Sequence, residues 1–447
     1  MTSPLSIQSL FTKIAPKSFF EEMDLKHGLE RRDGIYTTDV VAWMMMRQYL
    51  GGKPTLSAAV QALIAEQPKI LSDCKRVREG EISGGTSGYS QARTKLPNEV
   101  AVEVTDHIFQ RLRELMREGW KGLNRPIFAV DGTVCQLQSG PSLRKKFPPG
   151  RNQHGKNHWP MLRVVGFHDI FTGVAMRPSW GPVYGKKAVS EQALAIQNLV
   201  QLPADAVVLG DINFGIFRFA WHVRQSGRAA VLRLQLSRAR KMLGQEPKAG
   251  MNQAFTWTAS RDDRRGLPGL TEEEAQLTGR LVVFQHPHKA NELVCVFTDL
   301  DLPAEEIFAI YGLRWSMEVD LRTLKQTLNL HQLSSKSVEM TEKELLMAIS
   351  AYNLVRASIC LAARQAKLEP RELSFSQAQD VVLATLPSLQ RAESEAEFDD
   401  RIDRMLRRIA RCKLPKRRKP RSYPRVVWGQ GGRFPTRRCQ RKTRKAK

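Results

Sequence analysis

The sequence of 447 residues lacks any run of about 18 apolar residues, so it predicts no membrane-spanning segment. Its densest apolar stretch, residues 40–46, is too short to cross a bilayer. The N-terminus has neither the continuous apolar region nor the small-residue cleavage site of a secretory signal peptide. The 6 cysteines are scattered without a C-x-x-C pair, which argues against a zinc ribbon or a disulfide framework. We therefore expect a protein of the reducing cytoplasm that does not engage a membrane.

Acidic residues are scarce relative to basic ones. The chain has 70 lysines and arginines against 45 aspartates and glutamates, for a formal net charge of +25. Such an excess points to a polyanionic partner, and to nucleic acid before a membrane surface. The charge is uneven, because residues 411–447 carry sixteen of these cations and no acidic residue. This basic tail is predicted to be disordered by itself and to bind phosphates.

The rest of the chain predicts helical regions on either side of an α/β core. Residues 1–120 show apolar positions at helical spacing. Residues 121–238 predict strands at 126–137, two more within 162–176, and strands at 205–214 and 228–236, with helices at 187–202 and 215–227. This order favours a mixed sheet with helices packed on it. We expect a β-rich insertion at 239–300 and one long helix at 303–330, within a core segment at 301–335. Further helices are expected at 336–410.

Two of the predicted strands each end in an aspartate. Asp131 follows the apolar residues 127–130, and Asp211 follows residues 206–210. An aspartate just past an apolar strand lies where the chain leaves the core, at the edge of a sheet. Either residue alone is more often an ordinary turn former than a functional group.

The helix predicted around residues 311–325 carries charged side chains where a core-facing helix carries apolar ones. At about 100° per residue, side chains at positions i, i+3, i+7 and i+14 share one stripe about 60° wide. They are Tyr311, Arg314, Glu318 and Lys325, and Arg322 extends the same stripe. A solvated face laced with ion pairs is the alternative interpretation, but it does not explain the tyrosine.

The stripe pattern, Y-x-x-R-x-x-x-E-x-x-x-x-x-x-K, resembles the signature of the IS-four family of bacterial insertion-sequence transposases. Asp131 and Asp211 match the two upstream aspartate motifs of that family, each at a strand end. The similarity spans about residues 85–360 and includes the segment SGYSQARTKLP. The family often has arginine after the second aspartate, where this chain has Ile212. The resemblance implies a ribonuclease H-like core with a β-strand insertion between Asp211 and Glu318.

The resemblance also implies the chemistry of the site. Asp131, Asp211 and Glu318 would form a DDE carboxylate triad that binds two Mg²⁺ (or Mn²⁺) ions. Mg²⁺ prefers oxygen ligands and retains waters, so a few carboxylates suffice. Two such ions can stabilise both the attacking and the leaving oxygen of a phosphoryl transfer. The DNA-contact residues implied by the signature are Tyr311, Arg314 and Lys325, and we expect Arg322, which extends the same stripe, to contact DNA with them.

The implied activity is DNA transposition. The enzyme would cut double-stranded DNA at the terminal inverted repeats of its element and join them to target DNA, by cut-and-paste through a hairpin. A homodimer on DNA and association with the bacterial nucleoid are expected from the same resemblance. A catalytically inactive DNA-binding derivative and a nuclease of the same fold remain alternatives.

Two further predictions concern DNA recognition. Trp257, in the insertion, is a candidate platform for a flipped base, although a packed core tryptophan is the more frequent case. Residues 1–120 are a candidate for recognition of the element ends, because helices are the usual readers of the major groove. The alternative is that this helical region only packs or dimerises.

Overall fold

The computed structural model describes residues 11, 14–29, 34–51, 55–66, 70–71, 74–116, 125–152, 155–267, 269, 271, 273–286, 292–390 and 392–415. The chain divides into two compact units, Met1–Lys413 and Leu414–Lys447. Only residues 414 and 415 of the second unit are described, so nearly all of the predicted basic tail lies outside the described residues.

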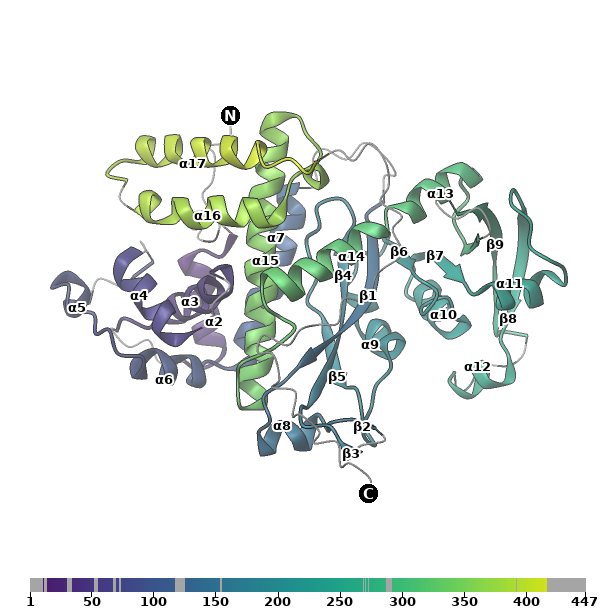
Figure 1. The fold of residues 1–447 in the computed structure, drawn as a ribbon, viewed down its shortest axis with the longest axis horizontal. Helices are drawn as coiled ribbons and strands as arrows, with labels where there is room; N and C mark the ends of the chain where they lie inside the picture. The colour runs from purple at the N-terminus through teal and green to yellow at the C-terminus, as the bar shows by residue number, and fades with distance from the viewer. Residues whose placement is uncertain are drawn as a thin grey trace, which may run out of the picture. The chain divides into compact units, whose positions relative to one another are not determined.

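The centre of the first unit is a mixed sheet of eight strands in the order β5-β4-β1-β6-β7-β10-β9-β8 (Figure 1). β6 runs parallel to both β1 and β7, and the other neighbouring strands pair antiparallel. The strands are β1 (Ile127–Gln136), β4 (Met161–Asp169), β5 (Ser179–Pro182), β6 (Val207–Gly210), β7 (Ala229–Leu234), β8 (Asn252–Thr258), β9 (Gln276–Gln285) and β10 (Leu293–Thr298). A small separate hairpin joins β2 (Arg151–Asn152) to β3 (Gly155–Lys156). The predicted α/β class with a mixed, ribonuclease H-like sheet is confirmed.

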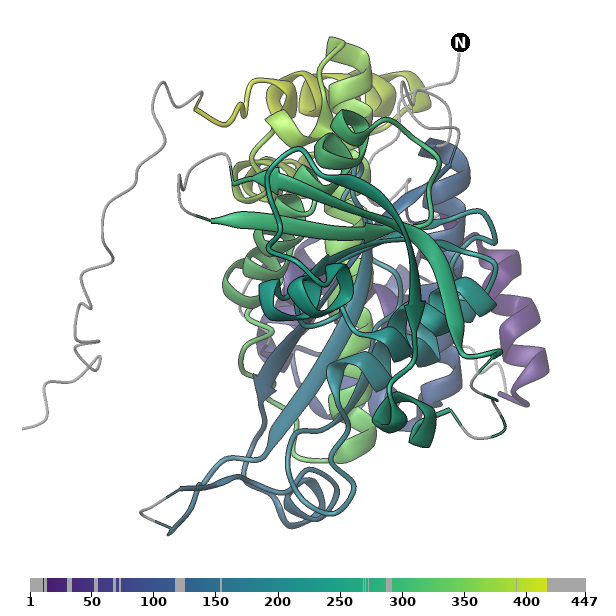
Figure 2. The same ribbon diagram turned by 90° about the vertical axis from the view of Figure 1, so that its right-hand side faces the viewer.

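The strands expected in the β-rich insertion extend this sheet and do not form one of their own. β10 pairs with β7, β9 pairs with β10, and β8 lies at the edge. Figure 2 views the sheet from this end. The extension follows from the sequence pattern, because β10 is an apolar run. Its backbone can form hydrogen bonds with the N–H and C=O groups that the edge of β7 would otherwise leave unpaired.

Helices cover both faces of the sheet. On one face lie α13 (Ala304–Gly312) and α14 (Trp315–Arg322), which pack on alternate residues of β1, β6, β7 and β10. The helices of the other core segments are α8 (Pro141–Lys146), α9 (Glu191–Asn198), α10 (Phe217–Gln225), α11 (Leu236–Leu243) and α12 (Arg261–Arg265). Because successive residues of a strand point to opposite faces, Ala129 and Leu209 face α13 and α14 while Phe128 and Val208 face the larger core.

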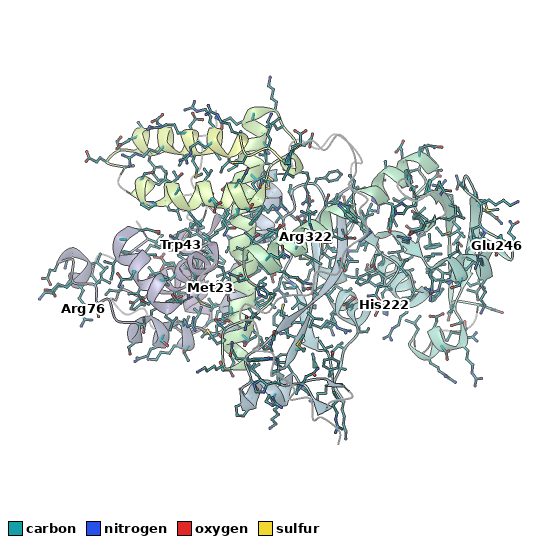
Figure 3. All side chains as sticks on the ribbon, in the orientation of Figure 1. Met23, Trp43, Arg76, His222, Glu246 and Arg322 are labelled. Carbon is teal, nitrogen blue, oxygen red and sulfur yellow. The ribbon has the colours of Figure 1, made fainter. Side chains whose placement is uncertain are left out.

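The terminal regions form a helical body around one long helix, α15 (Val338–Ala366) (Figure 1). Its neighbours are α3, α7, α16 and α17. The N-terminal helices are α2 (Lys17–Lys26), α3 (Thr38–Leu50), α4 (Leu56–Glu66), α5 (Lys75–Arg78), α6 (Ser87–Lys95) and α7 (Asn98–Met116), and the C-terminal ones are α16 (Phe375–Gln390) and α17 (Glu395–Ala410). Figure 3 labels Met23 and Trp43 within the N-terminal group. The helical nature expected of both regions is therefore seen in their described parts.

By length and composition, α15 is the one described helix that could cross a membrane. Its most apolar window is 94% buried inside the protein. Polar residues such as Asn353 and Arg356 interrupt its sequence, and both are buried among partners on neighbouring elements. The helix is thus the core of the helical body.

Candidate active site

Asp131 and Asp211 meet across two neighbouring parallel strands. The last paired residues of β1 and β6 are Ala129 and Leu209. Asp131 comes two positions after Ala129, and Asp211 comes two positions after Leu209. Both therefore continue the sheet face that α13 and α14 cover. The parallel register places the two carboxylates side by side at the end of β6.

The position of Asp131 differs from the sequence expectation. Asp131 does not end its strand, because β1 continues to Gln136 in an unbroken antiparallel ladder with β4, in which Asp131 is opposite Gly166. Only the parallel pairing with β6 ends before it. Asp211, by contrast, comes directly after β6, as expected.

Local hydrogen bonds orient both aspartates. The backbone N–H of Gly132 donates to Asp131 Oδ1 at 2.7 Å, and that of Asn213 donates to Asp211 Oδ1 at 2.9 Å. The turn after Asp211 brings the chain against β7, where a Cβ on Gly215 would lie 2.0 Å from the Arg233 carbonyl oxygen. Glycine is therefore required for this close approach.

Burial raises the pKa of Asp131 to about 6. The hydrogen bond from Gly132 and the charge of Arg314 oppose this shift, while the charges of Asp211 and Glu191 add to it. The neighbouring carboxylates are thus close enough to disfavour the ionisation of Asp131. A bound cation would relieve that repulsion.

The predicted long helix at 303–330 is broken. α13 ends at Gly312, α14 begins at Trp315, and a π-helical segment follows at Thr323–Thr327. Gly312 is a poor helix former. The position of α14 is fixed independently by the buried hydrogen bonds of Asp320 with Arg356 and Arg371. The stripe expected on one continuous helix is therefore divided between two helices.

The break places Arg314 at the centre of the site. Its Nη2 donates to Glu318 Oε1 at 3.1 Å, and its guanidinium carbon lies 5.8 Å from the centre of the Tyr311 ring. Its charge also lowers the pKa of Asp131. Arg314 therefore contacts Glu318 and Tyr311 and lies close enough to Asp131 for its charge to act on that carboxyl.

Tyr311 is only 8% exposed and faces β7. Burial raises its pKa, and the guanidinium groups of Arg314 and Arg233 oppose the shift. Its hydroxyl has no hydrogen bond of good geometry among the described residues. The phenol thus lies between two cations that cannot accept its proton.

The other two predicted DNA contacts lie further along. Arg322, labelled in Figure 3, is one helical turn after Glu318 and is exposed. Lys325 lies in the π-helical segment. Burial raises the pKa of the Cys135 thiol on β1, and the nearby charge of Lys325 opposes that rise. Cys135 shares a side of β1 with Asp131, so Lys325 lies along the same strand as the first carboxylate.

A buried ion cluster fixes α14 from the side opposite to Glu318. Asp320 is 0% exposed and accepts hydrogen bonds from Arg356 at 2.5 Å and from Arg371 at 2.6 and 2.9 Å. Although burial alone would raise its pKa, the two guanidinium groups hold the pKa of Asp320 well below its usual range. Asp320 is two residues from Glu318, so this cluster sets where α14 presents Glu318.

Three residues near the site were missed from the sequence. Arg233, on β7, donates to Glu292 at 2.7 Å and faces Tyr311. Glu191 begins α9 and lies against Gly132. The third is Asp320, on α14. The sequence signals were a lone cation within an apolar strand for Arg233, an acidic residue in the first turn of a helix for Glu191, and an aspartate among apolar neighbours for Asp320.

The prediction that Trp257 is a platform for a flipped base is wrong. It is 6% exposed and packs edge-on against Phe217 and Phe297, with ring centroids at 5.6 and 5.1 Å. The packed-core interpretation is confirmed. At the site itself the exposed aromatic residue is Trp315, with 62% of its surface accessible.

The donor set suits a hard divalent cation. Asp131, Asp211 and Glu318 offer only carboxylate oxygens, the ligands that Mg²⁺ and Mn²⁺ accept. Among the described residues, no three His, Cys, Asp or Glu side chains form a ready-made metal cage. That openness is compatible with Mg²⁺, which uses one or two carboxylates and fills its shell with water and phosphate oxygens.

Comparison with known proteins shows the family to which the chain belongs. The sequence pattern of the family described as "Transposase DDE domain" matches residues 122–354, which span the sheet, the insertion and the helix with Glu318. The chain is 28% identical over 368 residues to the transposase InsG for insertion sequence element IS4 of Escherichia coli strain K12. This match covers 78% of each chain.

The chain belongs to the DDE transposases, the class of metal-dependent enzymes that cleave DNA and transfer its strands. Within that class it is a transposase of the insertion-sequence type similar to that of IS4. The predicted family is thereby confirmed.

Proposed function

We propose that Asp131, Asp211 and Glu318 are the catalytic triad of this transposase and bind two Mg²⁺ or Mn²⁺ ions. The observation that carries the proposal is the register of β1 and β6, which places Asp131 beside Asp211 under α14. Arg314 supports the inclusion of Glu318, because it donates to Glu318 and its charge acts on Asp131. When bound, the ions would stabilise the negative charge that develops on the attacking and leaving oxygens.

The cations of the site would hold the DNA on either side of the scissile bond. Arg314 can exchange its contact with Glu318 for a bidentate contact with a phosphate. Tyr311, whose hydroxyl makes no hydrogen bond of good geometry with the described residues, can donate to a phosphate oxygen. Lys325 and Arg322 extend the contact along β1 and the exposed side of α14.

The reaction proposed is cut-and-paste transposition. A water oxygen attacks the phosphorus at the element end, its proton goes to solvent, and the bond to the 3′ oxygen breaks. The freed 3′-hydroxyl loses its proton and attacks a phosphorus of the opposite strand, which closes a hairpin and displaces the 3′ oxygen of the flanking DNA as a hydroxyl. Water then hydrolyses the hairpin phosphodiester and regenerates the 3′-hydroxyl of the element end. This hydroxyl attacks a phosphorus of the target strand, and the bond from that phosphorus to the target 3′ oxygen breaks, so the target 3′ end leaves as a hydroxyl.

The remaining parts of the chain would serve DNA binding. We assign recognition of the inverted repeats to the helical region 1–120 and sequence-independent affinity to the tail 411–447. The intervening segments keep their predicted roles: 121–238 and 301–335 for the catalytic core, 239–300 for the insertion and 336–410 for the C-terminal helices. Pairing of two element ends calls for a homodimer on DNA in the bacterial cytoplasm, at the nucleoid.

The test uses the DNA that flanks the coding region on both sides, with Mg²⁺ and a supercoiled target. Cleavage followed by joining supports the proposal, and a transient strand-closed end on a denaturing gel supports the hairpin. Specific binding without cleavage would identify an inactive DNA-binding derivative. Cleavage without joining would identify a nuclease of the same fold.

A further inference from the structure

Glu191 lies at the catalytic centre although it is outside the triad. It is the first residue of α9, directly after Ser190, whose hydroxyl accepts from the Ala193 N–H at 3.1 Å. α9 packs against β1, β4 and β5, on the side of the sheet opposite to α14. Glu191 therefore approaches the site from the side that Glu318 does not occupy.

A missing side chain on β1 admits this carboxylate. A Cβ on Gly132 would lie 2.5 Å from the carboxyl carbon of Glu191 and 2.7 Å from its Oε1. Any other residue at position 132 would displace Glu191. Gly132 is the residue after Asp131, and its backbone N–H donates to the Asp131 carboxylate. Glu191 therefore lies against the residue next to Asp131.

Asn213 joins Glu191 to the second member. Its Nδ2 donates to Glu191 Oε2 at 2.5 Å, and its backbone N–H donates to Asp211. Gln192 Nε2 donates to the side-chain oxygen of Asn213 at 2.7 Å, so the amide must turn its N–H groups toward Glu191. One oxygen of Glu191 is thus fixed by Asn213, and the other lies against Gly132.

An ordinary structural role does not explain these contacts. An acidic residue in the first turn of a helix interacts favourably with the helix dipole, and this accounts for Glu191 as the start of α9. It does not account for the placement of its carboxylate against the backbone next to Asp131.

We propose that Glu191 is a fourth carboxylate of the catalytic centre, a positioning residue that helps to hold the divalent cation from the α9 side. This inference rests on the proposed function of the triad. Groups that act behind the direct ligands typically change metal affinity by about 10- to 100-fold when they are removed. The same scale is expected here.

The experiment compares Glu191→Gln with Glu339→Gln in the full-length protein. Glu339 is an acidic residue in the first turn of α15, so it matches Glu191 in helix position but lies outside the site. Titration calorimetry with Mn²⁺, in the absence of DNA, should show affinity about 10- to 100-fold weaker in Glu191→Gln and unchanged in Glu339→Gln. The Mg²⁺ concentration for half-maximal cleavage should rise by a similar factor.

A second variant guards against a purely structural effect. Asn213→Ala keeps every carboxylate but removes the donor that orients Glu191, and it should weaken Mn²⁺ binding about 10-fold while thermal unfolding stays unchanged. Wild-type Mn²⁺ affinity in both Glu191→Gln and Asn213→Ala would overturn the inference. If the wild type binds Mn²⁺ but does not cleave, the proposed function fails while calorimetry still decides the role of Glu191.

Discussion

The buried cluster around Asp320 provides a direct test of how the fold positions α14, the helix that carries Glu318. Asp320 is fully buried between Arg356 and Arg371, and His168 Nδ1 lies 3.4 Å from its Oδ2. The substitution Asp320→Asn removes the negative charge and leaves a buried guanidinium without a counter-charge. Breaking a buried pair in this way costs about 3–5 kcal/mol of folding free energy.

The assay is urea unfolding of Asp320→Asn, followed by circular dichroism, with Asp400→Asn as the matched control. Asp400 pairs with Arg404 across one helical turn, and both side chains are more than half exposed. Such surface pairs contribute about 0.3–0.5 kcal/mol, so the control should unfold almost as the wild type does. Asp320→Asn should also slow cleavage, because the ion pairs that fix α14 and Glu318 are removed.

A destabilisation of less than about 1 kcal/mol in Asp320→Asn would refute this reasoning, since it would put the cluster in the range of an exposed ion pair. Normal cleavage by a destabilised variant would refute only the positioning role. The two readouts thus separate the stability claim from the functional one.

Three further predictions follow from the site and the tail. Gly132→Ala should displace Glu191 and raise the Mg²⁺ requirement for cleavage, and an unchanged requirement in a Mg²⁺ titration would show that the close approach has no role. Burial raises the pKa of Asp131 to about 6, so ionising this carboxyl in the folded protein costs folding free energy. This cost is present above pH 6 and absent below pH 3.8, the pKa of the group in the unfolded chain. Without metal, Asp131→Asn should therefore be more stable than the wild type at pH 8, by at most about 3 kcal/mol, with the difference vanishing near pH 4; equal thermal unfolding at pH 8 would contradict this. Truncation after Ala410 should weaken binding to specific and random duplexes alike and reduce the log–log salt slope by about 0.9 for each phosphate that the tail neutralises, whereas an unchanged slope in fluorescence anisotropy would argue against phosphate binding by the tail.

The sequence predicted the sheet well because its strands are short apolar runs. β6 and β7 are buried along nearly their whole length, and runs of that kind have few alternatives to a central strand. The same local pattern could not show that β1 continues past Asp131. That continuation depends on the ladder with β4, which is a long-range pairing.

The contacts of the candidate site were predictable where they follow from helical spacing, and not where they depend on residues distant in the sequence. Glu318 and Arg314 are one helical turn apart, so their contact follows from the sequence. The division of the helix before Trp315 involves Asp320, whose partners lie 36 and 51 residues away. Glu191 likewise owes its place to Gly132 and Asn213, which no periodicity connects to it.

The central claim is that Glu318 completes a metal-dependent triad with Asp131 and Asp211. The most direct measurement is the rate of Mg²⁺-dependent cleavage of the element ends by Glu318→Gln, at saturating DNA. Glu397→Gln is the control, because Glu397 also pairs with an arginine one turn away, on α17. The account predicts a fall of about 100-fold or more in Glu318→Gln, with DNA binding retained and the control unaffected. Cleavage by Glu318→Gln at the wild-type rate would mean that Glu318 is only an ion-pair partner of Arg314, and the catalytic assignment would be wrong.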